Sequence, residues 1–157
     1  MFKTIIWATD GSETADEALP FAKALAKCDG GTIVVVHSNE LLVGRAGGYP
    51  LFADEDVLEA KIRGQVEELE AEGFEATFKL ATGFAAHAAH TIAEAAREAD
   101  ADVIVVGTRG HGPMAGVLVG SVTQRLLHIA PCPVFAVPTA NRSIKRDRQS
   151  EQAAATR

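Results

Sequence analysis

The chain has 157 residues, of which 47% are hydrophobic and 23% charged, and its net charge at pH 7 is −6. This length predicts one domain with its own core, and no apolar run reaches the roughly 20 residues that a membrane-spanning helix needs. Residues 139–157 carry a net charge of +3, which leaves −9 on residues 1–138. So acidic a body argues against non-specific nucleic-acid binding, which requires phosphate neutralisation. We therefore expect a domain over residues 1–138 and a flexible basic tail over residues 139–157.

The cysteines and the first residues bear on the cellular compartment. Cys28 and Cys132 lie far apart and lack metal-ligand spacing, which favours two reduced thiols. Residues 1–7 lead directly into a strand-like run, unlike a signal peptide. These features predict a cytoplasmic protein.

The first third of the chain predicts a strand, a helix and a second strand. Residues 3–9 form a continuous apolar run, which is typical of a central parallel strand buried on both faces. Apolar residues at helical spacing from 15 to 26 predict one helix, capped by Ser12 and kinked at Pro20. Residues 32–37 repeat the pattern of a buried strand.

The middle third predicts a loop, a helix, an edge strand and another helix. Residues 39–53 contain several glycines and a proline, which favours a long loop. Residues 54–73 predict a helix, and residues 74–80 alternate in polarity as a half-exposed edge strand does. Residues 85–99 form an alanine-rich helix pattern. The apolar face of the first of these helices comprises Val57, Leu58, Ile62, Val66 and Leu69.

The last third begins with a buried strand over residues 102–106. A glycine-rich segment leads from it into a helix that ends at Ile129. Residues 132–137 form a short strand between prolines, which places it at a sheet edge because proline cannot donate to a ladder. The residues expected to face inward from the last helix are Val122, Leu126, Leu127 and Ile129.

Alternating strands and helices predict an α/β fold with an open five-stranded parallel sheet and helices on both faces. The buried and edge patterns fit the strand order 3-2-1-4-5. In this order the reversal lies between the first and fourth strands, where open α/β sheets bind ligands. Asp10 follows the first strand and Gly107 the fourth. We therefore expect the two residues to face one site.

The spacing of Gly107, Gly110, Gly120 and Ser121 is the most informative motif of the chain. It reads Gly-x-x-Gly, nine residues, then Gly-Ser. Glycines let backbone N–H groups approach an anion, and a helix N-terminus adds unpaired donors and a favourable dipole. The P-loop, dinucleotide-binding and hydrolase-elbow motifs are absent.

With Asp10 and this spacing, the sequence resembles the ATP-binding branch of the universal stress protein family. His37 at the end of the second strand and the Pro131–Val134 entry to the last strand agree, and the resemblance covers residues 1–138. It implies a Rossmann-like, adenine nucleotide alpha hydrolase-like fold and bound ATP or a related adenine nucleotide, with Mg²⁺ held through the phosphates. It also implies a homodimer, for which the edge strand Cys132–Val137 offers unpaired backbone groups.

The resemblance also implies roles for individual residues. Asp10 would contact the ribose hydroxyls, as suits a carboxylate, which would repel phosphate. The backbone of Ala8 and Ser38 would border the adenine, although the family often has a small apolar residue at Ser38. The remaining nucleotide-binding candidates, on the cleft wall and around the phosphates, are Thr9, Val106, Gly107, Arg109, Gly110, Gly120, Ser121, Val122 and Thr123.

Other interpretations stay open. Asp10 could cap the first helix, Gly107 could serve strand–helix packing, and Ser121 could be a simple N-cap. His87 and His90 fit surface positions better than a metal site. At the level of function, the alternatives are binding of another nucleotide such as cyclic AMP, a nucleotide-free scaffold, or an enzyme acting at an α-phosphate. No catalytic base or arginine finger is evident, so we expect at most a slow ATPase.

Overall fold

The structure, a computed structural model, describes residues 1–44, 47–50, 54–84, 87–108 and 119–138. Residues 139–157 lie outside this part, so the predicted flexible tail stays a prediction. The strands are β1 (Thr4–Ala8), β2 (Thr32–Gly44), β3 (Gly47–Pro50), β4 (Ala76–Phe84), β5 (Val103–Gly107) and β6 (Val134–Val137). The helices are α1 (Glu13–Asp16), α2 (Leu19–Asp29), α3 (Glu55–Ala71), α4 (Ala88–Glu98) and α5 (Ser121–Ile129).

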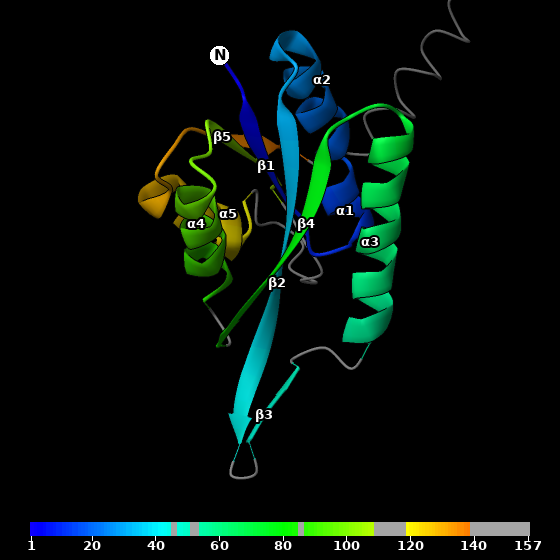
Figure 1. Ribbon diagram of the computed structural model, residues 1–157. Helices are drawn as coiled ribbons and strands as arrows, with labels where there is room; N and C mark the ends of the chain where they lie inside the picture. Colours follow the sequence, from blue (N-terminus) through cyan, green and yellow to red (C-terminus); the bar gives the residue numbers. More distant parts are fainter. Residues whose placement is uncertain (45–46, 51–53, 85–86, 109–118, 139–157) are drawn as a thin grey trace, which may run out of the picture.

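The parallel strands follow the order β4-β2-β1-β5-β6. This confirms the predicted order 3-2-1-4-5, counted over the five predicted strands. In the register of the central strands, Ala8 of β1 lies opposite Val36 of β2 and Val106 of β5. The carboxyl ends of β1 and β5 therefore meet at one edge of the sheet, as Figure 1 shows.

The prediction of a loop over residues 39–53 was wrong for residues 39–44 and 47–50, and its remaining residues, 45–46 and 51–53, lie outside the described residues. β2 continues to Gly44, and β3 returns antiparallel beside it, with Leu42 opposite Tyr49 and Gly44 opposite Gly47. Val43 and Tyr49 are good strand formers, and the glycines, Gly44, Gly47 and Gly48, lie where the two strands pair instead of in a loop. The hairpin projects from the body of the molecule (Figure 1).

The single helix predicted from Ser12 onward was also wrong in part. The chain forms a short helix α1 and then a separate helix α2, because Pro20 lies in the first turn of α2 instead of kinking a continuous helix. Proline is well tolerated there since its missing N–H has no helical partner. The predicted cap is confirmed: Ser12 Oγ accepts a hydrogen bond from the Ala15 N–H at 3.2 Å.

Helices cover both faces of the sheet, as predicted (Figure 1). Ile5 and Trp7 of β1 pack toward α2 and α3, whereas Ile6 and Ala8 pack toward α4 and α5. This alternation follows from the two-residue repeat of a strand. Trp7 is fully buried, and its indole Nε1–H donates to the Ala15 carbonyl at 3.4 Å.

Two residues predicted to face the core are exposed. Val57 of α3 is 70% exposed and Leu127 of α5 is 56% exposed. Each lies about a quarter turn from the buried stripe of its helix, and Glu55 of α3 is buried instead. The stripes that do pack inward on α3 and α5 are Leu58, Ile62, Val66 and Leu69, and Val122, Leu126 and Ile129.

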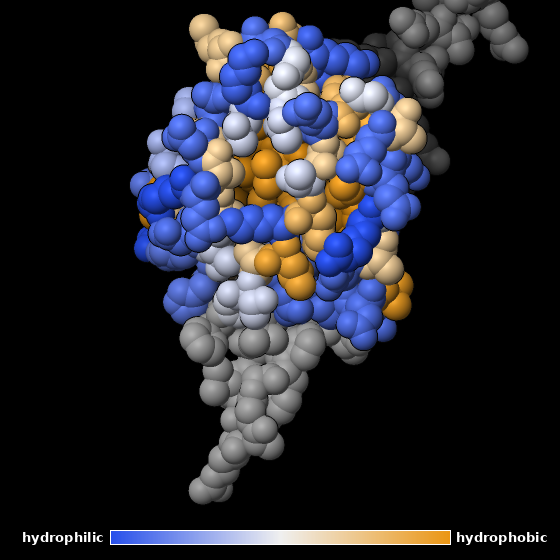
Figure 2. All heavy atoms as spheres, in the orientation of Figure 1, coloured by the Kyte–Doolittle hydropathy of each residue, from blue (hydrophilic) through white to orange (hydrophobic). Residues whose placement is uncertain are grey.

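β4 and β6 form the two edges of the parallel sheet, which confirms the predicted edge strands. Figure 2 views the molecule from the β4 side, where apolar side chains gather between the polar outer surfaces of α3 and α4. Leu80 of β4 is 37% exposed on this edge. Across the described residues, no helix has both the length and the apolar character that a membrane crossing requires.

Candidate functional site

The structure brings the two predicted strand ends together. β1 and β5 are hydrogen-bonded neighbours, and Asp10 follows β1 where Gly107 closes β5. The N-terminus of α5 joins them, because Gly120 donates its N–H to the carbonyl of Thr108 at 2.6 Å. A carboxylate, a strand end and a helix N-terminus from distant parts of the sequence thus share one edge of the sheet.

The β1–α1 turn is held by its own polar side chains. The Gly11 N–H donates to Thr9 Oγ1 at 3.0 Å. Asp10 Oδ1 accepts from the Ser12 N–H at 3.1 Å and from the Ser12 hydroxyl at 2.5 Å. Ser12, not Asp10, is therefore the N-cap of α1, and the Asp10 carboxylate is held at the end of β1 by the turn that follows it.

Helix α3 supports this turn from the α2 and α3 face. Lys61 Nζ donates to the Gly11 carbonyl at 2.6 Å and to Asp16 Oδ2 at 2.8 Å. Gly11 has a φ of +71°, and a Cβ at this position would lie 2.1 Å from Leu58 Cδ1. The left-handed backbone therefore favours glycine here, and any larger residue would also force the Leu58 side chain to move.

A buried polar pair adds a second contact from α3. His37 on β2 lies with Nδ1 3.0 Å from the Thr9 carbonyl oxygen and Nε2 2.7 Å from Glu55 Oε1. His37 is 2% exposed and Glu55 5% exposed. Sequence reasoning placed His37 only as the end of a strand and missed Glu55 altogether. Nothing in the local pattern of α3 marks Glu55 as a buried residue.

Two hydrogen bonds hold the residues at the carboxyl end of β5. The Thr108 N–H donates to the Val137 carbonyl of β6 at 2.8 Å, and the Thr123 hydroxyl donates to the Gly107 carbonyl at 2.8 Å. Thr123 is 3% exposed, so its hydroxyl is buried against the end of β5 and does not face solvent. Arg109 and Gly110, both predicted site residues, lie outside the described residues.

The N-terminus of α5 is suited to an anion. Its N-cap is Gly120, with φ −67° and ψ 159°, and Gly120 supplies no side-chain cap. The N–H groups of a first helical turn have no partner within the helix, and the helix dipole favours negative charge at this end. Ser121 is exposed beside these donors, and Val122 is half-buried against the core.

The two residues expected to border the adenine are Ala8 and Ser38. Ala8 is buried at the end of β1 opposite Val36 of β2, and Ser38 follows Val36 by two residues. Ser38 Oγ is buried and has no hydrogen-bond partner among the described residues. The same residues contain no cluster of three or more His, Cys, Asp or Glu side chains arranged to hold a metal ion.

Comparison with known proteins adds an independent observation. Residues 1–138 match the sequence model of the universal stress protein family. The chain belongs to this family. A universal stress protein of Thermus aquaticus is 37% identical over 140 residues, which cover 87% of this chain and 99% of that protein.

Two solved structures extend the comparison to three dimensions. A universal stress protein from Archaeoglobus fulgidus in complex with dAMP is 28% identical with a TM-score of 0.61, over 87% of this chain and 98% of that chain. A universal stress protein in complex with cAMP has a TM-score of 0.66 at 22% identity, over 88% and 99% of the two chains. The second likeness concerns the fold alone, which is the Rossmann-like sheet described above.

Proposed function

We propose that this universal stress protein binds an adenine nucleotide, and that ATP is the nucleotide it holds, at the carboxyl ends of β1 and β5. The observation that carries the proposal is that Asp10 and the N-terminus of α5, whose N-cap Gly120 supplies no side-chain cap, lie at neighbouring strand ends. The two groups are chemically opposite: one accepts hydrogen bonds, and the other donates them. A nucleotide needs an acceptor for its ribose hydroxyls and donors for its phosphates.

The orientation of the nucleotide follows from this chemistry. The Asp10 carboxylate would accept the ribose hydroxyls, and the first N–H groups of α5 would donate to the phosphates. The backbone of Ala8 and Ser38 would border the base. The related protein from Archaeoglobus fulgidus, solved with dAMP, supports an adenine nucleotide. Mg²⁺ would enter through the phosphates, since a phosphate chain supplies its own oxygen ligands.

The site favours holding a nucleotide over hydrolysing it rapidly. Residues 8–10, 107–108 and 119–123, which form the described strand ends and the start of α5, contain one carboxylate and no basic side chain. In the proposed orientation the ribose hydroxyls occupy the Asp10 carboxylate, so Asp10 does not orient an attacking water. Phosphoryl transfer to water requires a group that positions the attacking water. We therefore assign the nucleotide a regulatory role, which selects one conformation for partner proteins.

Calorimetric titration with ATP, ADP, AMP and cyclic AMP tests the proposal. We expect ATP to bind more tightly than millimolar, with affinity falling as phosphates are removed. Preference for cyclic AMP would establish the alternative ligand, and no binding by any of the four would leave a nucleotide-free scaffold. Release of pyrophosphate with a candidate co-substrate would instead establish an α-phosphate enzyme.

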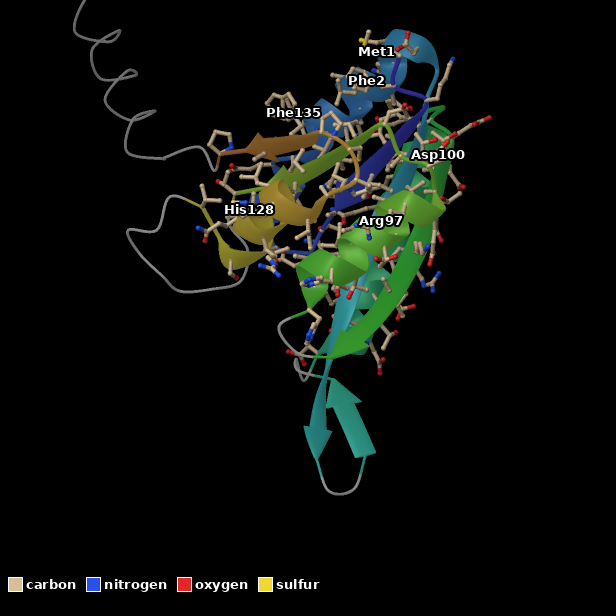
Figure 3. The ribbon with its side chains drawn as sticks, turned by 90° about the vertical axis from the view of Figure 1, so that its left-hand side faces the viewer. Met1, Phe2, Arg97, Asp100, His128 and Phe135 are labelled. Atoms are coloured by element: carbon tan, nitrogen blue, oxygen red, sulfur yellow. The ribbon has the colours of Figure 1, made fainter. Side chains whose placement is uncertain are left out.

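We further propose that the protein forms a homodimer through the edge strand β6. Phe135 projects from this strand (Figure 3) and is 42% exposed. Its ring packs 5.5 Å from that of Phe21 on α2, which is 44% exposed. Exposed aromatic side chains beside an unpaired strand edge favour association. A second copy related by a two-fold axis would satisfy the edge and cover both rings.

A further inference from the structure

We infer that His37 is a positioning residue, which holds the Thr9 carbonyl, and through it the Asp10 carboxylate, in place for the ligand. His37 belongs to β2 and reaches across to the residue that precedes Asp10. Its second ring nitrogen is bound by Glu55, in the first turn of α3. We call the contacts of His37 with Thr9 and Glu55 the clamp. Its role in nucleotide binding rests on the proposed function, whereas the contacts themselves do not depend on it.

The chemistry of the contacts determines where hydrogens lie on the ring. A backbone carbonyl is only an acceptor, so Nδ1 must carry a hydrogen and donate it to Thr9. A second hydrogen lies between Nε2 and Glu55 Oε1, which are 2.7 Å apart. The Thr9 carbonyl therefore fixes the hydrogen on Nδ1, and Glu55 holds the plane of the imidazole from the other side, as carboxylates do for other functional histidines.

Burial makes this arrangement specific. His37 is 2% exposed and Glu55 is 5% exposed, and Glu55 Oε2 has no hydrogen-bond partner among the described residues. A buried polar group without its partner is costly. An apolar side chain of similar size would fill this space without the cost of burying an imidazole and a carboxylate. The presence of the pair is therefore explained by the backbone that it holds in place.

What it holds is the start of the β1–α1 turn. The Thr9 N–H donates to the Val36 carbonyl at 3.0 Å, and the Thr9 carbonyl accepts from His37, so both backbone groups of Thr9 are bound to β2. On the other side of Asp10, Lys61 of α3 binds the Gly11 carbonyl at 2.6 Å. Asp10 thus lies between two residues whose carbonyls are held from β2 and α3. Loss of the His37 contact would free the first of them.

Two substitutions separate the contacts of the ring. In His37→Asn, the amide nitrogen takes the place of Nδ1 and can still donate to Thr9, but the side chain is too short for Glu55. In His37→Gln, the amide takes the place of Nε2 and can still bind Glu55, but no donor faces Thr9. We expect the ATP dissociation constant to stay within about twofold in His37→Asn and to rise about tenfold in His37→Gln, as expected for one buried hydrogen bond.

Two further measurements keep the inference testable. Hydrogen exchange of the Gly11 and Ser12 amides, which are bonded to Thr9 Oγ1 and Asp10 Oδ1, should be faster in the ligand-free His37→Gln protein and stay near wild type in His37→Asn, whether or not any nucleotide binds. In the wild-type protein, ¹⁵N spectra should show a slowly exchanging hydrogen on His37 Nδ1, with no variant required. A bare Nδ1, or an equal effect of the two substitutions on the Asp10 turn, would overturn the clamp. Failure of wild-type protein to bind any nucleotide would overturn the proposed function and leave these readouts intact.

Discussion

The backbone N–H of Gly120 donates to the carbonyl of Thr108 at 2.6 Å, so the residue that begins α5 is bonded directly to the residue that follows β5. This hydrogen bond joins the two ends of the connection between β5 and α5. The start of α5 is therefore tied directly to the carboxyl end of β5. An anion bound at this helix N-terminus would meet donors that are already in place.

Gly120 offers the most direct test of the phosphate site. Its φ of −67° and ψ of 159° suit any residue, so Gly120→Val leaves the backbone unstrained. We expect the branched side chain to block the approach of phosphates and to raise the ATP dissociation constant at least about tenfold, or about 1.4 kcal/mol. Isothermal titration calorimetry measures this. Gly64→Val is a matched control, because a Cβ at Gly64 on α3 meets nothing within 4 Å; unchanged ATP affinity in Gly120→Val would mean that the connection is structural.

Asp10→Asn tests the ribose contact. The amide oxygen can still accept from Ser12, so the turn is kept while the negative charge is lost. If Asp10 holds the ribose, the affinities for adenosine and for ATP should fall by a similar factor, about tenfold. Ser12→Ala is the companion variant: it removes the cap of α1, about 1 kcal/mol of stability, and one of the two hydrogen bonds from Ser12 to Asp10, but it keeps the negative charge. A drop for ATP alone would place Asp10 near the phosphates instead.

The adjacent glycines 30 and 31 predict unequal losses of stability. Gly30 has a φ of +61° and open space around its Cβ position, whereas a Cβ on Gly31 would lie 2.4 Å from the Phe2 carbonyl oxygen. Gly30→Ala should cost about 1 kcal/mol through the left-handed backbone. Gly31→Ala should cost about 3 kcal/mol, because backbone atoms must move. Urea unfolding compares the two, and a larger loss in Gly30→Ala would show that backbone conformation outweighs the clash.

Asp102, just before β5 at the amino ends of the central strands, predicts that the stability of the protein depends on pH. The N–H groups of Thr4 and Lys3 donate to its carboxylate and hold the pKa of Asp102 below its ordinary value of 3.8. Because the folded-state pKa is the lower one, this stabilisation is complete above the unfolded-state pKa and is lost as the pH falls through the folded-state pKa. Asp102→Asn should therefore lower the urea midpoint at pH 7, with a difference that shrinks toward pH 3. Asp100→Asn controls for the loss of one nearby charge, and an equal effect of both variants would rule out the hydrogen bonds as the cause.

Light scattering after size exclusion tests the proposed homodimer. A charge on the exposed aromatic pair of α2 and β6 should prevent two β6 edges from pairing, so Phe135→Glu should be monomeric at concentrations where the wild type is dimeric. Leu80→Glu places the same charge on the opposite edge strand, where Leu80 is 37% exposed. Dissociation by Leu80→Glu and not by Phe135→Glu would move the interface to β4.

The strand order could be predicted because continuous and alternating apolar runs distinguish buried strands from edges. The spacing from Gly107 to Ser121 likewise needs no structure, since a glycine-rich connection between a strand and a helix is a local feature. The hairpin of β2 and β3 escaped prediction because its glycines also fit a loop, and only the pairing of Leu42 with Tyr49 shows otherwise.

Contacts across the fold were beyond the reach of the sequence. Glu55 begins an acidic helix and resembles its exposed neighbours in every local respect, yet His37 on another strand makes it a buried partner. The place of Thr123 in the motif makes it a nucleotide-binding candidate but does not reveal that its hydroxyl donates to the Gly107 carbonyl, a partner that depends on how α5 returns to β5. Such pairings are set by tertiary packing, not by the residues nearby in the chain.

Trp7 is the only tryptophan of the chain, and it is buried in β1 with its indole N–H on the Ala15 carbonyl beyond the Asp10 turn. The protein therefore contains a single tryptophan fluorophore, attached on both sides of the segment that would meet a nucleotide. Excitation at the red edge of the tryptophan band would report on this turn without labelling. A ligand that repositions Asp10 should shift or quench that emission, whereas one bound elsewhere should leave it unchanged.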